Sequence, residues 1–335
     1  MVVISDVTLR DGNHAMRHQL TAPQIQGYAH AADEAGLDIL EVGHGNGLGA
    51  SSCLLGQSAT SDRTMLEVAR EALKTTRLGV HFIPGFGKSS DIAMALDIGV
   101  DVVRVATHCT EANTSARFIR QVRQAGKTAF GVLMMSHMAP QEVLLSQARL
   151  MESYGAEAII LMDSAGYSTP SLVKSKVRCL VDGLEIKVGF HAHNNLGLAV
   201  ANSLTGLEEG ASIIDACING LGAGAGNTQL ETLIAALERD GYSLKMSFED
   251  VIRLSRCAET LLDHKTPHIP VQNITSGLYG LFSGFVPHIQ NAAKQFNVNE
   301  FDLCKKLCDR RLVAGQEDII FEEAGQLATM SHSVS

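Results

Sequence analysis

The chain of 335 residues has no long hydrophobic run, because no stretch approaches the roughly 18 uninterrupted apolar residues that a membrane span needs. It has no basic run either, and its formal charge is −9, from 27 Lys and Arg against 36 Asp and Glu, which argues against a nucleic-acid partner. The seven cysteines form no Cys-x-x-Cys pair and are odd in number, which favours reduced thiols over a disulfide framework. The first residues are too few and too uncharged for a signal peptide. Together these absences predict a cytoplasmic enzyme, and the negative net charge means that an anionic substrate would need a local cation or metal.

Strand-like and helix-like segments alternate over the first 240 residues. Eight short β-branched or apolar runs predict strands at Val2–Val7, Leu37–Val42, Leu78–Ile83, Val102–Ala106, Thr128–Leu133, Ala158–Met162, Ile186–Phe190 and Ser212–Ile218. Amphipathic segments between them predict helices that include Gln24–Ala35, Thr64–Lys74, Ala112–Ala125, Pro140–Tyr154 and Leu196–Glu209. This alternation predicts an α/β fold, a (β/α)8 TIM barrel, with a doubly wound open sheet as the alternative.

The pattern changes after residue 238, where the strand-like runs stop. Helical spacing recurs at Phe248–Leu262, Phe285–Phe296 and Glu300–Arg311. The segment Thr266–Asn273 contains two prolines, which disfavour regular structure and predict a connection there. We therefore predict a catalytic barrel over residues 1–262 and a helical domain over residues 263–335.

The clearest chemical signal is the run His191-Ala192-His193 at the end of the seventh predicted strand. Side chains alternate along a strand, so the two imidazoles project from one face and reach one metal ion. Asp11, in the loop after the first strand, supplies an oxygen ligand. Two histidines and one carboxylate leave positions open for substrate and suit a divalent transition metal, with Mn²⁺ favoured by a keto acid's oxygens. The alternatives are two hydrogen-bonded histidines inside the barrel and a turn residue at Asp11.

Three further polar residues follow the first two strands. Arg10 beside the core needs a partner, which Glu41 or an anionic ligand provides. Oriented by Glu41, Arg10 stabilises a developing enolate, although a purely structural ion pair remains an equal alternative. His14, in the same loop as Asp11, is a candidate general base, and the alternative for any single histidine is a surface position.

The glycine-rich loop from Asn219 to Asn227 does not match a dinucleotide fingerprint. From Gly220 the third glycine position is Ala225, and the loop closes the βα series instead of opening one. A loop that contacts the metal site or a substrate carboxylate fits better, with a tight turn that closes the barrel as the alternative. Asn227 is a candidate additional oxygen ligand. A serine hydrolase has no local support, because there is no Gly-x-Ser-x-Gly motif.

Several motifs together resemble those of 4-hydroxy-2-oxovalerate aldolases of the DRE-TIM metallolyase superfamily, and the resemblance covers nearly the whole chain. These motifs are Thr8–His14, Arg104–Cys109, Met134–Met138, Asp163–Gly166, His191–Asn195, Glu208–Gly210, Gly222–Asn227 and Gly315–Asp318. The resemblance implies a class II pyruvate aldolase whose divalent metal, usually Mn²⁺, is held by Asp11, His191 and His193.

The resemblance also implies that Arg10 stabilises the pyruvate enolate, that His14 is the base and that Ser164 contacts the substrate. Such aldolases usually pair with an acylating aldehyde dehydrogenase, which receives the aldehyde through a channel. The helical C-terminal region forms much of that contact. The implied reaction is reversible cleavage of a 4-hydroxy-2-oxo acid to pyruvate and an aldehyde, within a homo-oligomer or a hetero-oligomer.

Three positions depart from the family pattern. Phe282 stands where the family has a functional Tyr, and Tyr279, three residues earlier, is a substitute if the segment is helical. His81 stands where the family usually has Leu, on the same strand face as Ile83, which predicts a more polar aldehyde pocket. Ala314 stands where the family often has Gly, near the expected channel. These departures predict a specialised relative.

Two other functions remain as alternatives at this point. One is a Claisen-type acyl-CoA/2-keto acid synthase or lyase of the same superfamily, which would use the same metal triad. The other is a non-catalytic partner subunit of an aldehyde dehydrogenase, suggested by Phe282 and His81.

Overall fold

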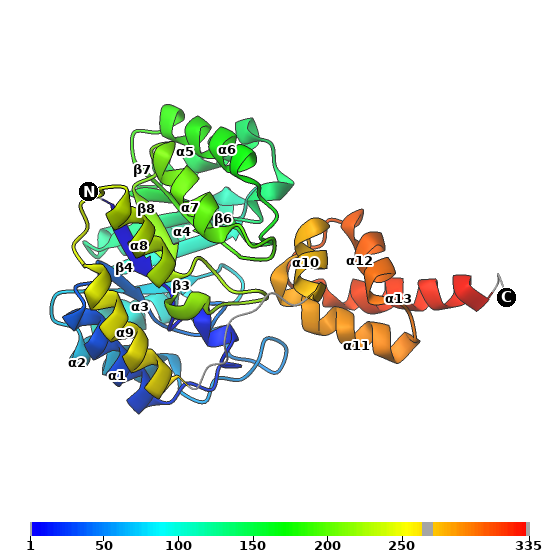
Figure 1. Ribbon diagram of the computed structural model, residues 1–335, viewed down its shortest axis with the longest axis horizontal. Helices are drawn as coiled ribbons and strands as arrows, with labels where there is room; N and C mark the ends of the chain where they lie inside the picture. Colours follow the sequence, from blue (N-terminus) through cyan, green and yellow to red (C-terminus); the bar gives the residue numbers. More distant parts are fainter. Residues whose placement is uncertain (1, 263–270, 333–335) are drawn as a thin grey trace.

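The computed structural model describes residues 2–262 and 271–332, and within them eight parallel strands close into a barrel in chain order (Figure 1). The strands are β1 Val3–Asp6, β2 Ile39–Glu41, β3 Arg77–Phe82, β4 Val102–His108, β5 Thr128–Met134, β6 Ala158–Asp163, β7 Lys187–Ala192 and β8 Ile213–Ala216. All eight predicted strands are present, and β1 pairs with β8 to close the barrel. The TIM-barrel prediction is confirmed, and the open-sheet alternative is wrong.

Helices follow the strands and cover the outside of the barrel. They are α1 Ala22–Glu34, α2 Asp62–Ala72, α3 Ser89–Ile98, α4 Ala116–Gln124, α5 Gln141–Ser153, α6 Pro170–Gly183, α7 Ala199–Glu208, α8 Leu230–Arg239 and α9 Phe248–Leu261. Two predicted helix starts differ from these bounds by more than two residues. The segment predicted as one helix from Ala112 begins as a 3-10 turn, Ala112–Ser115. The helix predicted from Leu196 begins at Ala199, whose backbone N–H is accepted by the Asn194 side chain.

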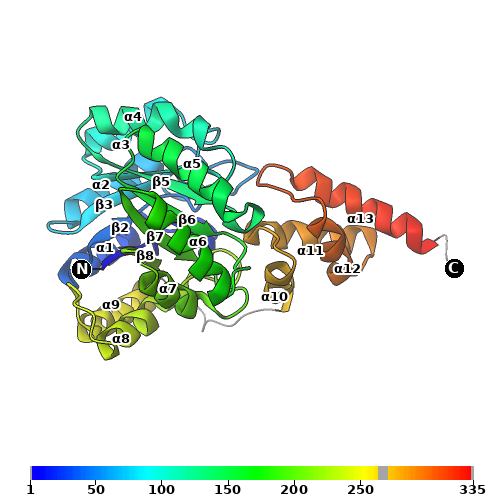
Figure 2. The ribbon, with the colours of Figure 1, turned by 90° about the horizontal axis from the view of Figure 1, so that it is seen from above.

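A second group of helices projects from one end of the barrel in both ribbon views (Figures 1 and 2). It comprises α10 Val271–Leu278, α11 Val286–Phe296, α12 Glu300–Cys308 and α13 Glu317–His332. The prediction of irregular structure over Thr266–Asn273 is wrong at its end, because α10 begins at Val271; residues 266–270 lie outside the described residues. A proline restricts the residue before it rather than those after it, so Pro270 does not prevent a helix from starting at the next residue.

Three apolar clusters stabilise this arrangement. The largest lies between the sheet and the surrounding helices. A small one fills the barrel interior with alternate strand residues, among them Ile39, Val102, Ile160 and Ile213. The C-terminal helices have their own cluster, centred on Leu281, Phe285, Ile289, Leu303, Leu307 and Ile320. A separate core supports the predicted helical domain, and the boundary at residue 262 stays a prediction.

Among the residues that the structure describes, no helix is both long and apolar enough to cross a membrane.

Candidate active site and metal centre

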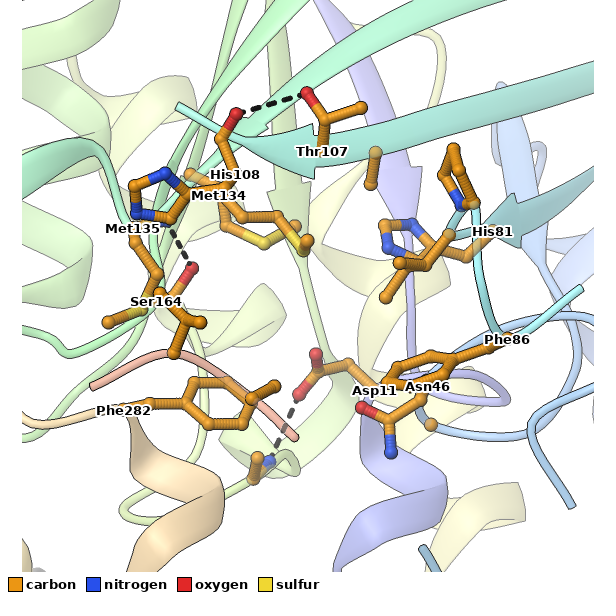
Figure 3. Close-up of a pocket in the computed structure, with 18 of the residues that line it drawn as sticks. Asp11, Asn46, His81, Phe86, Thr107, His108, Met134, Met135, Ser164 and Phe282 are labelled. Carbon is orange, nitrogen blue, oxygen red and sulfur yellow. Dashed lines mark hydrogen bonds between the residues drawn. The ribbon is translucent and has the colours of Figure 1, made fainter. Parts of the chain in front are cut away.

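A cavity of about 210 Å³ opens at the carboxyl ends of the strands, where a barrel of this kind carries its chemistry (Figure 3). Of the predicted site residues, those that line it are Arg10, Asp11, His14, His81, Ser164, His193 and Phe282. Ile83 also lines it, as strand alternation from His81 predicts. His191, Glu41 and Asn227 lie directly behind this wall, bonded or paired to residues that line the cavity.

Asp11, His191 and His193 converge as the sequence predicts. Their potential ligand atoms all lie within 4.8 Å of one another. His191 Nε2 is 3.4 Å from His193 Nε2 and 4.0 Å from Asp11 Oδ2. Donor atoms that share one metal at about 2.1 Å lie roughly 3 to 3.5 Å apart, so a small closure of this triad would accommodate an ion.

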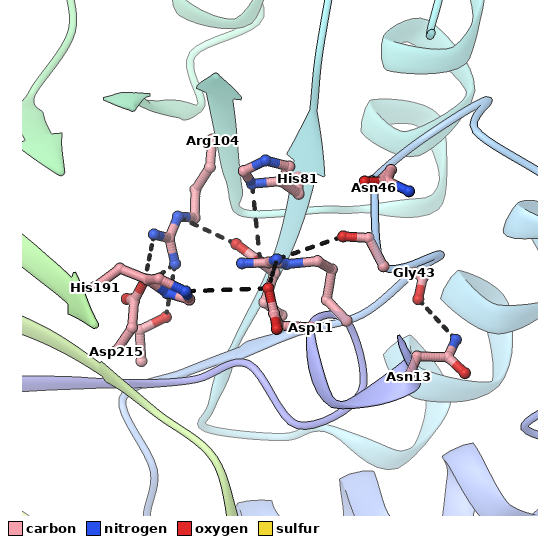
Figure 4. A network of polar contacts seen from close by, with 12 residues as sticks. Asp11, Asn13, Gly43, Asn46, His81, Arg104, His191 and Asp215 are labelled. Atoms are coloured by element: carbon pink, nitrogen blue, oxygen red, sulfur yellow. Dashed lines mark hydrogen bonds and ion pairs between the residues drawn. The ribbon is translucent and has the colours of Figure 1, made fainter. Parts of the chain in front are cut away.

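Asp215, on β8, fixes the orientation of His191. Its Oδ2 lies 2.8 Å from His191 Nδ1, so the imidazole donates from Nδ1 and keeps the Nε2 lone pair for the metal side (Figure 4). Arg104, on β4, pairs with both oxygens of Asp215. We assigned neither residue a role from sequence. The available signal was their position at alternate, inward-facing sites on predicted strands.

Asp11 is held by the glycine-rich loop. Its Oδ1 accepts hydrogen bonds at 3.0 Å from the Ala223 backbone N–H and from Asn227 Nδ2, and its Oδ2 pairs with Arg10. Burial alone would raise the pKa of Asp11, but the charge of Arg10 holds it well below its usual value. The loop therefore contacts the predicted metal site and does not simply form a turn. Asn227 Oδ1 is buried and has no partner among the described residues, so its role as a ligand stays a prediction.

The charges around the triad favour a bound cation. Three buried carboxylates, on Asp11, Glu41 and Asp215, face two buried guanidiniums, on Arg10 and Arg104. Burial lowers the pKa of His193 to about 4, so its imidazole is neutral at pH 7. The cluster thus has one carboxylate more than it has guanidiniums, and a buried net charge is costly. A divalent cation at the triad would offset this charge, and the donor set fits such an ion.

Arg10 has one guanidinium nitrogen left for a ligand. Its Nε donates to Glu41, which is the predicted pair, and its Nη1 contacts Asp11. Nη2 is buried and has no partner within the described part of the chain. An unpaired buried donor in a cavity wall favours an anionic ligand, so the ion pair and the substrate contact are compatible here.

His14 packs directly on Gly45, in the loop after β2. A Cβ on Gly45 would lie only 2.2 Å from His14 Nε2, so the imidazole occupies space that only a glycine leaves free. Burial lowers the pKa of His14 below its usual 6.5. A neutral imidazole in the cavity wall is suited to accept a proton at neutral pH.

His81 is buried in the barrel mouth without a hydrogen bond from Nδ1 to any described residue. Its Nδ1 lies 4.0 Å from Glu41 Oε1. Burial, followed by the charges of Arg10 and Arg104, lowers the pKa of His81 well below its usual value, so the imidazole is neutral. Sequence reasoning identified the residue, and the structure adds that the surrounding protein leaves it unsatisfied.

Ser164 and Phe282 close the opposite side of the cavity (Figure 3). Ser164 Oγ accepts a hydrogen bond from the Met135 backbone at 3.0 Å, which leaves its hydroxyl proton for another acceptor. Phe282 comes from the loop that follows α10. Tyr279 is not a substitute in this structure, because its ring packs on Phe301 and does not line the cavity.

Loops between the C-terminal helices complete the cavity with Val313 and Ala314 as well as Phe282. Hydrogen bonds across the junction hold this wall in place. Asn195 Nδ2 donates to the Asn273 carbonyl at 3.0 Å, and His137 Nε2 donates to the Gly280 carbonyl at 2.8 Å.

Comparison with known proteins shows the family of this chain. Residues 1–258 match the HMGL-like family model, and residues 267–329 match the DmpG-like communication domain. Over 98% of its length, the chain is 73% identical to the 4-hydroxy-2-oxovalerate aldolase of Burkholderia thailandensis, of which it covers 94%. The chain belongs to the 4-hydroxy-2-oxovalerate aldolase family. A second member, from Pectobacterium atrosepticum, is 50% identical over 98% of this chain and 96% of that relative.

Solved structures with lower identity share the fold of this 4-hydroxy-2-oxovalerate aldolase family member. The N-terminal domain of a putative aldolase from Bacteroides vulgatus superposes with a TM-score of 0.74 at 23% identity, over 88% of this chain and 98% of that one. The carboxyl transferase domain of Rhizobium etli pyruvate carboxylase superposes with a TM-score of 0.79 at 18% identity, over 98% of this chain and 60% of that one.

Proposed function

We propose that the protein is a divalent-metal-dependent pyruvate aldolase that reversibly cleaves a 4-hydroxy-2-oxo acid into pyruvate and an aldehyde. The observation that carries the proposal is the convergence, at one cavity, of the Asp11, His191 and His193 triad, the free Nη2 of Arg10 and the neutral imidazole of His14. Family membership supports the same reaction class, since the named relatives are 4-hydroxy-2-oxovalerate aldolases.

A divalent metal held by Asp11, His191 and His193, which we propose to be Mn²⁺, supplies Lewis-acid polarisation of the 2-keto group when it is bound. His14 accepts the proton of the C4 hydroxyl, and the C3–C4 bond breaks as the C4–O bond becomes the aldehyde carbonyl. The electron pair of the broken bond forms the C2–C3 double bond, and the pair of the C2 carbonyl moves onto its oxygen, which gives the enolate. Arg10 Nη2 donates a hydrogen bond to this developing charge. A proton delivered to C3, which balances the proton that His14 accepted, gives pyruvate.

The aldehyde end of the cavity is where we propose that this chain differs from its relatives. The unsatisfied His81 offers a polar group to the aldehyde, and Ser164 offers a hydroxyl proton to the substrate. Phe282 offers no hydroxyl, so nothing at this position assists a proton transfer or steers the C4 configuration. We therefore propose that the preferred aldehyde carries a polar group.

We also propose that the C-terminal helices bind an acylating aldehyde dehydrogenase, as the match to a communication domain supports. Three large apolar side chains are exposed on α10 and α12: Ile274 (43%), Leu278 (56%) and Phe301 (48%). Apolar side chains clustered at a surface favour a protein contact. Ile274→Asp should abolish co-purification with a dehydrogenase that pairs with a relative of this chain. Leu150→Asp, on α5 and 37% exposed, should leave co-purification intact, and equal retention in both variants would reject this surface.

Pyruvate release from a 4-hydroxy-2-oxo acid tests the main proposal. We expect no release after chelation of metal and recovery on addition of Mn²⁺. His193→Ala should bind no Mn²⁺ and release no pyruvate, whereas His30→Ala, at an exposed position on α1, should behave as the wild type. Wild-type levels of bound metal in His193→Ala would remove the proposed site. Release of free CoA from acetyl-CoA and a keto acid, without retro-aldol activity, would instead favour the Claisen-type alternative.

A further inference from the structure

Arg104 crosses the interior of the barrel below the cavity and is 1% exposed. It leaves β4 and reaches β8, where Nη1 lies 2.9 Å from Asp215 Oδ1 and Nη2 contacts Asp215 Oδ2 (Figure 4). On the way, its Nε forms an ion pair with Glu41 Oε2, on β2, at 3.1 Å, although the two atoms do not have hydrogen-bond geometry. One guanidinium thus connects three strands that are distant in sequence.

Each carboxylate that contacts Arg104 also contacts a residue of the proposed site. Glu41 uses its other oxygen to accept from Arg10 Nε. Asp215 Oδ2 accepts from His191 Nδ1 at 2.8 Å. The five side chains therefore form one buried series in which donors alternate with carboxylates and Arg104 is at the centre. In order, they are Arg10, Glu41, Arg104, Asp215 and His191.

We infer that Arg104 is a positioning residue, which sets through Glu41 the direction of the Arg10 guanidinium and through Asp215 the tautomer and orientation of the metal-binding His191. This inference rests on the proposed function of the site. A carboxylate in the barrel interior can rotate unless donors hold both of its oxygens. Among the described residues, Arg104 is the partner of Asp215 Oδ1, and without it Asp215 would be free to turn away from His191.

Stability alone is a weak reason for a buried arginine at this position. The neighbouring interior layer is apolar, with Val102 two residues earlier on the same strand face. Replacing a buried ion pair by well-packed apolar side chains is often neutral or stabilising. The planar, forked guanidinium of an arginine is instead suited to hold one carboxylate in one orientation, which the ammonium group of a lysine cannot do.

Arg104→Lys separates geometry from charge, because it keeps the positive charge and removes the fork. The probe is Mn²⁺ alone, titrated by calorimetry into metal-free protein. We expect about tenfold weaker Mn²⁺ binding, and kcat for pyruvate release about 10- to 100-fold lower, as for other groups that orient metal ligands. Arg70→Lys is the matched control, since Arg70 pairs with Asp101 at 2.8 Å outside the barrel, and it should change neither quantity.

Asp215→Asn breaks the same connection from the other side and should weaken Mn²⁺ binding by a similar factor. Because Arg104 acts on His191 through Asp215, the double variant Arg104→Lys/Asp215→Asn should bind Mn²⁺ no more weakly than the single variant with the lower Mn²⁺ affinity. Wild-type affinity in a folded Arg104→Lys protein, or additive losses in the double variant, would overturn the inference. If Arg104→Lys does not fold, as judged by circular dichroism, wild-type affinity in Asp215→Asn overturns it. A wild-type protein that binds no Mn²⁺ would contradict the proposed function instead.

Discussion

Gly45→Ala tests the role of His14 without touching His14 itself. A Cβ on Gly45 would lie 2.2 Å from Nε2, 2.3 Å from Cδ2 and 2.5 Å from Cε1 of the His14 ring. Ordinary contacts begin near 3.4 Å, so the ring must move by more than about 1 Å. The backbone of Gly45 does not have a positive φ, so alanine is conformationally allowed there. The substitution should therefore displace the imidazole and leave the fold intact.

The expected loss follows from this displacement. Misplacing a catalytic group by about 1 Å costs on the order of 100-fold in rate, which corresponds to about 2.7 kcal/mol in the barrier. Mn²⁺ affinity and the melting temperature should change little, because the backbone of Gly45 contacts Arg10 Nη1 at 3.4 Å and His18 Nδ1 at 3.5 Å, and the substitution leaves both backbone groups in place.

The assay is pyruvate release at saturating substrate, together with Mn²⁺ titration and thermal melting. Gly325→Ala on α13 is the matched control, since its Cβ would meet no atom closer than 3.4 Å, and its kcat should equal that of the wild type. Combining Gly45→Ala with His14→Ala should cost no more than His14→Ala alone. A Gly45→Ala enzyme with more than half of wild-type kcat would refute the assignment of His14 as a precisely placed base.

Four further predictions concern other groups. Arg10→Lys keeps the charge beside Asp11 but loses Nη2. The Mn²⁺ affinity measured by titration should therefore be unchanged, while kcat falls because the activation barrier rises by about 3 kcal/mol. His81→Leu should shift the preference in aldol addition of pyruvate from a hydroxylated aldehyde toward propanal, and equal changes in both rates would reject a role of His81 in aldehyde selection. Phe282→Tyr should alter the rate of aldol addition or the C4 configuration of the product, but not Mn²⁺ binding. Burial raises the pKa of Asp6 to about 6 from 3.8, so the folded state binds this proton more tightly than the unfolded state. The contribution of Asp6 to the free energy of unfolding of the wild type should therefore fall by up to about 3 kcal/mol as pH rises from 4 to 6. Denaturant melts of Asp6→Asn should lack this loss, and parallel pH curves for the two proteins would contradict the shift.

The barrel and the proposed metal triad were predictable because their signals are local. Alternation along one strand places His191 and His193 on the same face whatever surrounds them. The eight apolar runs and the helical segments between them predict parallel strands with polar residues at the strand ends, and the observed pairing closes them into a barrel. Asp11, Arg10 and His14 were predictable for the same reason, since they directly follow the first strand.

Contacts across the barrel were decided by the tertiary structure alone. Arg104 and Asp215 are 111 residues apart, and their pairing depends on how eight strands are staggered when the barrel closes. The contact between His14 and Gly45 likewise depends on how two loops pack, which cannot be predicted from the periodicity of the sequence. Tyr279 shows the same limit, because its spacing from Phe282 allowed a place in the cavity, but packing against Phe301 directs its ring elsewhere. Local periodicity determines which face a side chain occupies, whereas its partner on that face is determined by the register and packing of segments far apart in the chain.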